Sequence, residues 1–263
     1  MMELNFIPLV SVITVVRNDV KNIERTLCSI FEQTYQNIEL IIIDGASTDG
    51  TKEVIDKWMS NNQAKEGRIL QYISERDKGV YDAMNKGIRK SHGAFVNFMN
   101  SGDVFHAPNS IEILHLEAVV PNTIVYGDTN TTYGDITQRE KPREFFKTYM
   151  KFKGIGICHQ SMFFPGEELR KRQYDLSYRI VADYALSYDM WKTGTQFLYR
   201  DIIVADYKWG NGISSNPFGL IEVYRENARV AGQQWNLLFW AKMVLEYYRL
   251  YTKKLYRNKK SRN

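Results

Sequence analysis

Cysteine is scarce in this sequence, and an export signal is missing. Only two of 263 residues are cysteine, Cys28 and Cys158, and they form no CxxC pair. This excludes a disulfide framework and the usual zinc site, so we expect a reducing, cytoplasmic location. The chain starts MMELNFIPLVSVITVV, with no basic stretch before the apolar run. That pattern predicts a first core strand and not a signal peptide.

Glycine-rich phosphate loops are missing as well. The segment after the first apolar run, RNDVKN, contains no glycine, so it does not form the GxGxxG turn of dinucleotide-binding folds. The same lack disfavours a nucleotidyltransferase, and no GxxxxGK[ST] motif indicates an NTPase. A diphosphate ligand would then need another counter-charge. A divalent cation held by carboxylate oxygens is one such group.

Positive charge is concentrated at the end of the chain. The formal net charge is +5, and residues 242–262 hold eight Lys or Arg against one acid, Glu246. The rest of the chain is near neutral, so a nucleic-acid partner is not expected. We predict that residues 217–263 form a helical, basic amphipathic extension whose charge-free stretch, residues 230–241, is too short to span a bilayer.

Two partners fit this extension equally well. Residues 235–263 have the charge for peripheral contact with an anionic membrane on the inner face of the plasma membrane. The same helix pattern fits packing on the body of the protein or in a homodimer. The pattern does not choose between them.

Short β-branched apolar runs alternate with helical patterns through the first half of the chain. Such alternation predicts right-handed βαβ units and an α/β fold with a mainly parallel sheet flanked by helices. The strands are expected at residues 9–16, 38–44, 68–74 and 94–100, and the helices at 20–33, 51–61 and 80–90.

The alternation is less regular after residue 105, but the same sheet is expected to continue. We predict one domain over residues 1–216, followed by the extension over residues 217–263. The elements expected in this part are a helix at 109–119, a strand at 123–128, a hairpin at 133–138, a strand at 158–164, a helix at 181–193 and a strand at 196–207.

Acidic residues follow the predicted strands where parallel strands present their carboxyl ends. Asp44 ends the second apolar run, and Asp103 follows the fourth in the sequence NSGD. Both adjoin a glycine, which lets the backbone approach a ligand closely. Asp19 and Asp49 are predicted instead to cap helices.

Four motifs stand in one order along the chain, VSVITVVRN, IELIIIDGASTDGT, SERDKGVYDAMNKG and FVNFMNSGD. Together they resemble the donor half of family 2 glycosyltransferases, over about residues 8–110. CHQSMFF, YRIVADYAL and NGISS resemble the acceptor half, over about residues 111–216, of the subgroup that builds bacterial surface polysaccharides. The resemblance implies a GT-A fold, which is Rossmann-like, and a nucleoside-diphosphate sugar donor. It also implies a Mg²⁺ or Mn²⁺ ion and inversion at the anomeric carbon.

The resemblance also implies roles for individual residues. Asp44 resembles the acid that reads the nucleoside base, and Asp103 resembles the metal-binding acid of the DxD motif, in which Ser101 replaces the first acid. Asp183 resembles the general base, while an N-cap of the helix that follows is the plain alternative. Other donor contacts are expected from Arg17, Asn18, Lys78, Asp82, Asn85, Ser101 and Gly102, and acceptor or phosphate contacts from His159 and Gln160.

The implied function is inverting transfer of a hexosyl or N-acetylhexosaminyl group from a UDP-sugar to a carbohydrate acceptor. A lipid-linked oligosaccharide at the cytoplasmic leaflet is the acceptor we expect. A nucleotidyltransferase is the alternative enzyme. The missing DxD acid keeps a non-catalytic module that binds nucleotide sugars or polysaccharide open.

Overall fold

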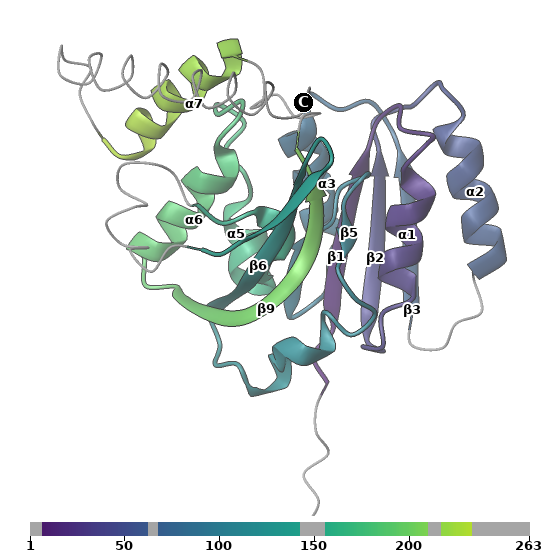
Figure 1. Ribbon diagram of the computed structural model, residues 1–263, viewed down its shortest axis with the longest axis horizontal. Coiled ribbons are helices and arrows are strands. Elements are labelled where there is room, and N and C mark those ends of the chain that lie inside the picture. The colour runs from purple at the N-terminus through teal and green to yellow at the C-terminus, as the bar shows by residue number, and fades with distance from the viewer. Residues whose placement is uncertain (1–6, 63–67, 143–155, 210–216, 233–263) are drawn as a thin grey trace, which may run out of the picture.

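The computed structural model describes residues 7–62, 68–142, 156–209 and 217–232 of the protein. Within them nine strands form one curled sheet, in the order β3-β2-β1-β4-β8-β6-β9-β5, with β7 paired to β6 (Figure 1). The strands are β1 Val10–Val16, β2 Ile38–Asp44, β3 Arg68–Ser74, β4 Phe95–Phe98, β5 Val104–Phe105, β6 Thr123–Tyr133, β7 Ile136–Glu140, β8 Met162–Pro165 and β9 Gln196–Lys208.

Helices cover both faces of this sheet, as the α/β prediction requires. The apolar residues of β1 and β2 alternate between two clusters, because successive side chains of a strand point to opposite faces. α1 and α2 pack on one face, and α3, α5 and α6 pack on the other. The helices are α1 Ile23–Phe31, α2 Thr51–Asn62, α3 Val80–Lys90, α5 Gly166–Arg172, α6 Ala182–Lys192 and α7 Pro217–Val230.

The first half of the chain confirms the predicted βαβ series. β1 is hydrogen-bonded to β2 on one side and to β4 on the other, and both pairs are parallel. Strand order therefore reverses at β1, and ligands of open α/β sheets bind outside the carboxyl ends of the strands at such a point. The second half adds antiparallel pairs of β8 with β4 and β6, so the sheet is mixed.

Several elements differ from those expected from the sequence. The helix predicted at 109–119 is two 3₁₀ turns, Glu112–Leu114 and Leu116–Ala118, with His115 in the left-handed conformation at φ 53° between them. Residues His159–Ser161, expected in a strand, form a 3₁₀ turn before β8. α5 was not expected.

The described part of the predicted C-terminal extension contains one helix, α7. α7 ends at Val230, and Gly232 follows at φ 63°. Residues 233–263, and with them the predicted basic face, lie outside the described residues. Within the described part of the chain, no helix combines the length and the apolar character needed to cross a membrane.

Candidate functional site

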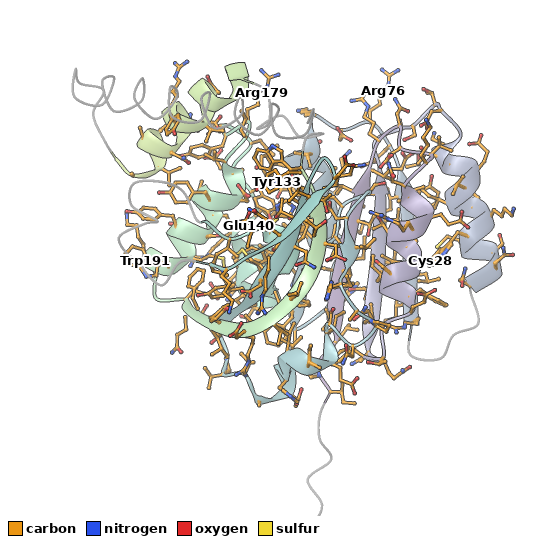
Figure 2. The ribbon with its side chains drawn as sticks, in the orientation of Figure 1. Cys28, Arg76, Tyr133, Glu140, Arg179 and Trp191 are labelled. Carbon is orange, nitrogen blue, oxygen red and sulfur yellow. The ribbon has the colours of Figure 1, made fainter. Side chains whose placement is uncertain are left out.

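The carboxyl ends of β1, β2 and β3 stand in register at one edge of the sheet. Val16 pairs with Asp44, and Asp44 pairs with Ser74. The chain after β4 joins this edge, because Ser101 N donates to the carbonyl oxygen of Val15 at 3.1 Å. Arg76, which follows β3, and Arg179, which precedes α6, are labelled along the same upper side of Figure 2.

Arg17, a predicted donor contact, lies beside the start of the β2–α2 loop. A Cβ atom at Gly45 would lie 3.2 Å from Arg17 Cδ and 2.2 Å from Asp77 Oδ2. Because Gly45 has no side chain, Asp77 from the β3–α3 loop and Arg17 from the β1–α1 loop can both lie close to its backbone. Asn18, at φ 51°, links the same loops, because its Oδ1 accepts from Thr48 N at 2.8 Å.

Asp44 lies at this edge but is fully buried. Its carboxylate accepts from Ser47 N and Ser47 Oγ, at 3.1 and 2.5 Å, and from Ser74 Oγ at 2.6 Å. These bonds close the β2–α2 loop. A nucleobase would have to replace one of the serine hydroxyls to reach Asp44, so its assignment as the base-reading acid stays a prediction.

The predicted donor residues of the β3–α3 region separate into two kinds. Asp82 Oδ2 accepts from the exposed Lys78 at its backbone N, at 2.9 Å, and so holds the loop at the helix start. Asn85 is buried, and its amide exchanges two bonds with the Tyr174 backbone, at 2.7 and 2.8 Å. Asn85 thus joins α3 to the segment before α6, and a donor contact would cost both bonds.

Asp103 is a buried carboxyl group with one amide partner. It is 7% exposed, and Gln160 Nε2 donates to its Oδ2 at 2.7 Å. Burial raises the pKa of Asp103 to about 6, against the opposing Gln160 hydrogen bond and the nearby His159. The Cys158 thiol donates to Gln160 Oε1 at 2.7 Å, which leaves the Gln160 amide nitrogen for Asp103.

A second acid lies next to this group, and the sequence reading missed it. Ser101 Oγ donates to Asp19 Oδ2 at 2.7 Å, and the charge of Asp19 also acts to raise the pKa of Asp103. The predicted capping role of Asp19 is wrong, because the N-cap residue of α1 is Asn22, and Asp19 Oδ1 accepts from the Asn22 side chain at 2.6 Å. Gly102 permits the tight turn between Ser101 and Asp103 through its φ of 97°.

His159 connects this part of the site to Asp183. Its Nε2 lies 3.0 Å from the Asn100 amide nitrogen, and its Nδ1 lies 3.7 Å from Asp183 Oδ2. With the amide as donor, the imidazole carries its proton on Nδ1 and faces the carboxylate. His159 and Gln160 are neighbours in one turn, so that turn contacts both Asp103 and Asp183.

Asp183 stands in the first turn of α6 and is a quarter exposed, at 26%. Its Oδ1 accepts from Tyr184 N at 2.8 Å and from the Tyr81 hydroxyl at 3.3 Å. The N-cap residue of α6 is Val181. Asp183 therefore satisfies one backbone donor of the helix start and still presents an oxygen outside the helix.

The His159–Gln160 turn links Asp103 to Asp183, and Asp19 lies beside Asp103. The charges of Asp103 and Asp183 both act to raise the pKa values of Cys158 and Tyr207, which burial raises most strongly. Among the described residues, no group of three or more His, Cys, Asp or Glu side chains is placed to hold a metal ion. A cation here would need oxygens from its substrate as well.

The family profile described as "Glycosyl transferase family 2" matches residues 11–184. The chain belongs to this family. The match runs from β1 to the first turn of α6, so it spans every side chain of the site described above. The fold is GT-A, and the chain is a glycosyltransferase.

Relatives by sequence are also glycosyltransferases. A "PGL/p-HBAD biosynthesis glycosyltransferase" of Mycobacterium bovis is 28% identical over 219 residues, which cover 79% of this chain and 80% of that protein. An uncharacterized glycosyltransferase of Mycobacterium tuberculosis is 32% identical over 182 residues, covering 67% of this chain and 66% of the other.

Two solved structures share the fold. The mannosyltransferase PcManGT from Pyrobaculum calidifontis, in complex with GDP-Man and Mn²⁺, has a TM-score of 0.62 at 19% identity. The match covers 85% of this chain, which spans 65% of the mannosyltransferase. Staphylococcus aureus TarS 1–349 with UDP-GlcNAc has a TM-score of 0.59 at 15% identity, covering 85% of this chain and 70% of the other.

Proposed function

We propose that the protein is an inverting, metal-dependent glycosyltransferase that uses a nucleoside-diphosphate sugar, with UDP as the nucleotide. The observation that supports this most is the His159–Gln160 turn, which contacts Asp103 through Gln160 and Asp183 through His159. A metal-binding acid and a general base must both lie within reach of one anomeric carbon. The turn supports the proposal because it contacts both carboxylates.

The residues around Asp103 fit a divalent cation. Burial disfavours the ionised form of this carboxyl group, and a bound cation would favour it again. Mg²⁺ is commonly held by one or two carboxylates together with substrate phosphates, which suits a site with few protein ligands. Asp103 would hold the ion, and the cation when bound would neutralise the departing diphosphate.

Asp19 can provide the second carboxylate that the DxD motif lacks at position 101. Its carboxylate bonds the Ser101 hydroxyl, so a negative charge lies next to the place where the DxD motif has its first acid. We include Asp19 in the donor site for this reason. The same contact weakens the alternative of a binding module that has lost catalysis.

Asp183 is the proposed general base. A hydroxyl group of the acceptor gives its proton to the carboxylate while its oxygen bonds to the anomeric carbon, and the bond to the diphosphate oxygen breaks with its electron pair. This displacement inverts the configuration. His159 and Tyr81 hold the carboxylate in place from two sides.

The acceptor proposed is a saccharide carried on a lipid, in the synthesis of a bacterial surface polysaccharide. Support comes from the resemblance of the acceptor half and from the basic sequence of residues 242–262. Hexosyl and N-acetylhexosaminyl donors are both consistent with the site. UDP and GDP sugars, with Mg²⁺ or Mn²⁺, are therefore the substrates to test first.

The deciding experiment compares two aspartates of α6. Asp183→Asn should bind donor normally and lose transfer by about 10²- to 10⁴-fold, as expected for loss of a positioned base. Asp189→Asn is the control, because Asp189 lies on the same helix and forms an exposed ion pair with Arg172 at 2.6 Å. Transfer at the wild-type rate by Asp183→Asn, or a product that retains the donor configuration, would refute the proposal.

A further inference from the structure

The carboxylate of Glu226, on α7, holds the backbone that leads into α6. Glu226 is 5% exposed. Its Oε1 accepts from Arg179 N at 2.7 Å, and its Oε2 accepts from Ile180 N and Val181 N at 2.9 and 3.0 Å. Three consecutive backbone donors thus share one buried carboxylate. Such charge-assisted bonds are stronger than those to a neutral acceptor.

The opposite side of the same backbone is held from α3. The Tyr81 hydroxyl donates to the carbonyl oxygen of Ile180 at 2.5 Å and lies 3.3 Å from Asp183 Oδ1. The segment 179–181 is therefore fixed through its N–H groups by Glu226 and through a carbonyl group by Tyr81. Asp183 follows two residues after this segment, in the first turn of the helix.

A second residue of α7 holds the chain just upstream. The Arg229 guanidinium stands 3.7 Å from the centre of the Tyr178 ring, and Arg229 also donates to Ser177 Oγ at 2.9 Å. Val223 and Val230 of α7 pack against the core cluster that contains buried residues of α6. α7 therefore packs against α6 and the segment before it, and Figure 1 shows α7 above α6 on the left.

We propose that Glu226 is a positioning residue for the general base, so that α7 completes the site from beyond residue 184, where the family match ends. This inference rests on the proposed role of Asp183. The three hydrogen bonds hold the backbone up to two residues before Asp183. A displacement of this backbone would therefore move the first turn of α6 and the Asp183 carboxylate with it. A misplacement of about 1 Å at a reacting group costs about 10²-fold in rate.

Glu226→Gln tests this with little change in shape. The amide keeps one acceptor oxygen but turns an NH₂ group toward backbone donors. We expect kcat for transfer to fall about 10- to 100-fold while the KM for the donor stays within about twofold, since the proposed donor contacts lie in the loops after β1, β2 and β4 and at the start of α3. Glu222→Gln is the matched control, one turn earlier on α7, where Glu222 is more exposed and pairs with Arg225 at 3.9 Å.

A double mutant separates positioning from general damage to the fold. If Glu226 acts through Asp183, Glu226→Gln should change transfer less than about twofold in an Asp183→Asn protein. Arg229→Leu, which releases Tyr178 and Ser177, provides a second variant, with a smaller loss of the same kind. If thermal unfolding shows that Glu226→Gln does not fold, Arg229→Leu tests the positioning role in its place.

The outcomes distinguish the two proposals. Equal fold-losses from Glu226→Gln in the wild-type and Asp183→Asn backgrounds would overturn the positioning role and leave the base intact. A rise in donor KM with kcat unchanged would overturn it as well. Full transfer by Asp183→Asn alone would refute the base itself, and the inference with it.

Discussion

Replacing Asp103 by asparagine should stabilise the cation-free protein at neutral pH and abolish sugar transfer. The pKa of Asp103 is raised by burial from 3.8 to about 6. A shift of about two units corresponds to roughly 3 kcal/mol of unfavourable free energy for the ionised carboxylate in the folded protein. Asparagine carries no charge, and its amide oxygen can still accept from Gln160 Nε2.

The sign of the pH dependence follows from the direction of this shift. Because folding raises the pKa of Asp103, the group favours the folded state fully below pH 3.8. That contribution is lost as the pH rises through about 6. The free energy of unfolding of Asp103→Asn, relative to wild type, should therefore increase by roughly 2.4 kcal/mol between pH 4 and pH 7.

Urea or thermal unfolding in the presence of a chelator measures this difference. For a chain of this size, roughly 3 kcal/mol corresponds to a gain of about 6–12 °C in the melting temperature at neutral pH. Asp189→Asn should show no such gain, because Asp189 is exposed. A difference between Asp103→Asn and wild type that does not vary with pH would refute the reasoning. Adding Mn²⁺ and nucleoside diphosphate should stabilise wild type alone, by about 2.7 kcal/mol at 100 times the dissociation constant.

Two substitutions and one binding assay probe the site and its surroundings. Gln160→Glu replaces the amide donor of Asp103 with a second carboxylate, so transfer should fall by at least about 10²-fold at every Mn²⁺ concentration, which an activity titration measures. Glu39→Ala should lower the free energy of unfolding by about 3 kcal/mol in urea and leave specific activity unchanged, because this buried acid bonds Ser11, Gln71 and His92 away from the site. Full-length protein should co-sediment with anionic vesicles at low salt and lose binding as salt rises, and failure to sediment would exclude the membrane role of residues 235–263.

The sequence predicts the first half of this fold well because local patterns carry the information there. The strands are short, β-branched and apolar, the helices have one apolar stripe, and polar residues separate them. In a parallel sheet that pattern also places the ends of the strands together. This pattern predicts Asp44 and Asp103 at the carboxyl ends of the strands, and the structure has both at that edge.

The helix predicted at 109–119 fails for a geometric reason. Ile111, Leu114 and Leu116 are all buried in one cluster with α1. On an α-helix, two residues separated by two positions point about 200° apart, so one helix cannot turn Leu114 and Leu116 to the same core. The left-handed His115 breaks the helix and buries both. Apolar content alone did not show this.

α5 was missed because it has almost no apolar periodicity to detect. Leu169 is its one large buried side chain. A different signal was present, since Glu167 and Glu168 stand in the first turn and three basic residues stand in the last, as the helix dipole favours. Charge order along a short segment would have found this helix where hydrophobicity did not.

The contacts made by Glu226 and Asp19 were beyond a reading of local sequence, since both depend on which strands and helices become neighbours. Asp19 follows β1 and Ser101 follows β4, 82 positions later, and their side chains meet because β1 and β4 are adjacent and parallel. The linear DxD motif has a serine, Ser101, at the position of its first acid. The strand order brings Asp19 next to that serine, which is why we propose Asp19 as part of the donor site. In a sheet of this kind, a pair of acidic residues is better sought in the loops that follow neighbouring strands than within the loop of a single strand. A serine in place of one acid of a linear motif is therefore not evidence that the site lacks a second carboxylate.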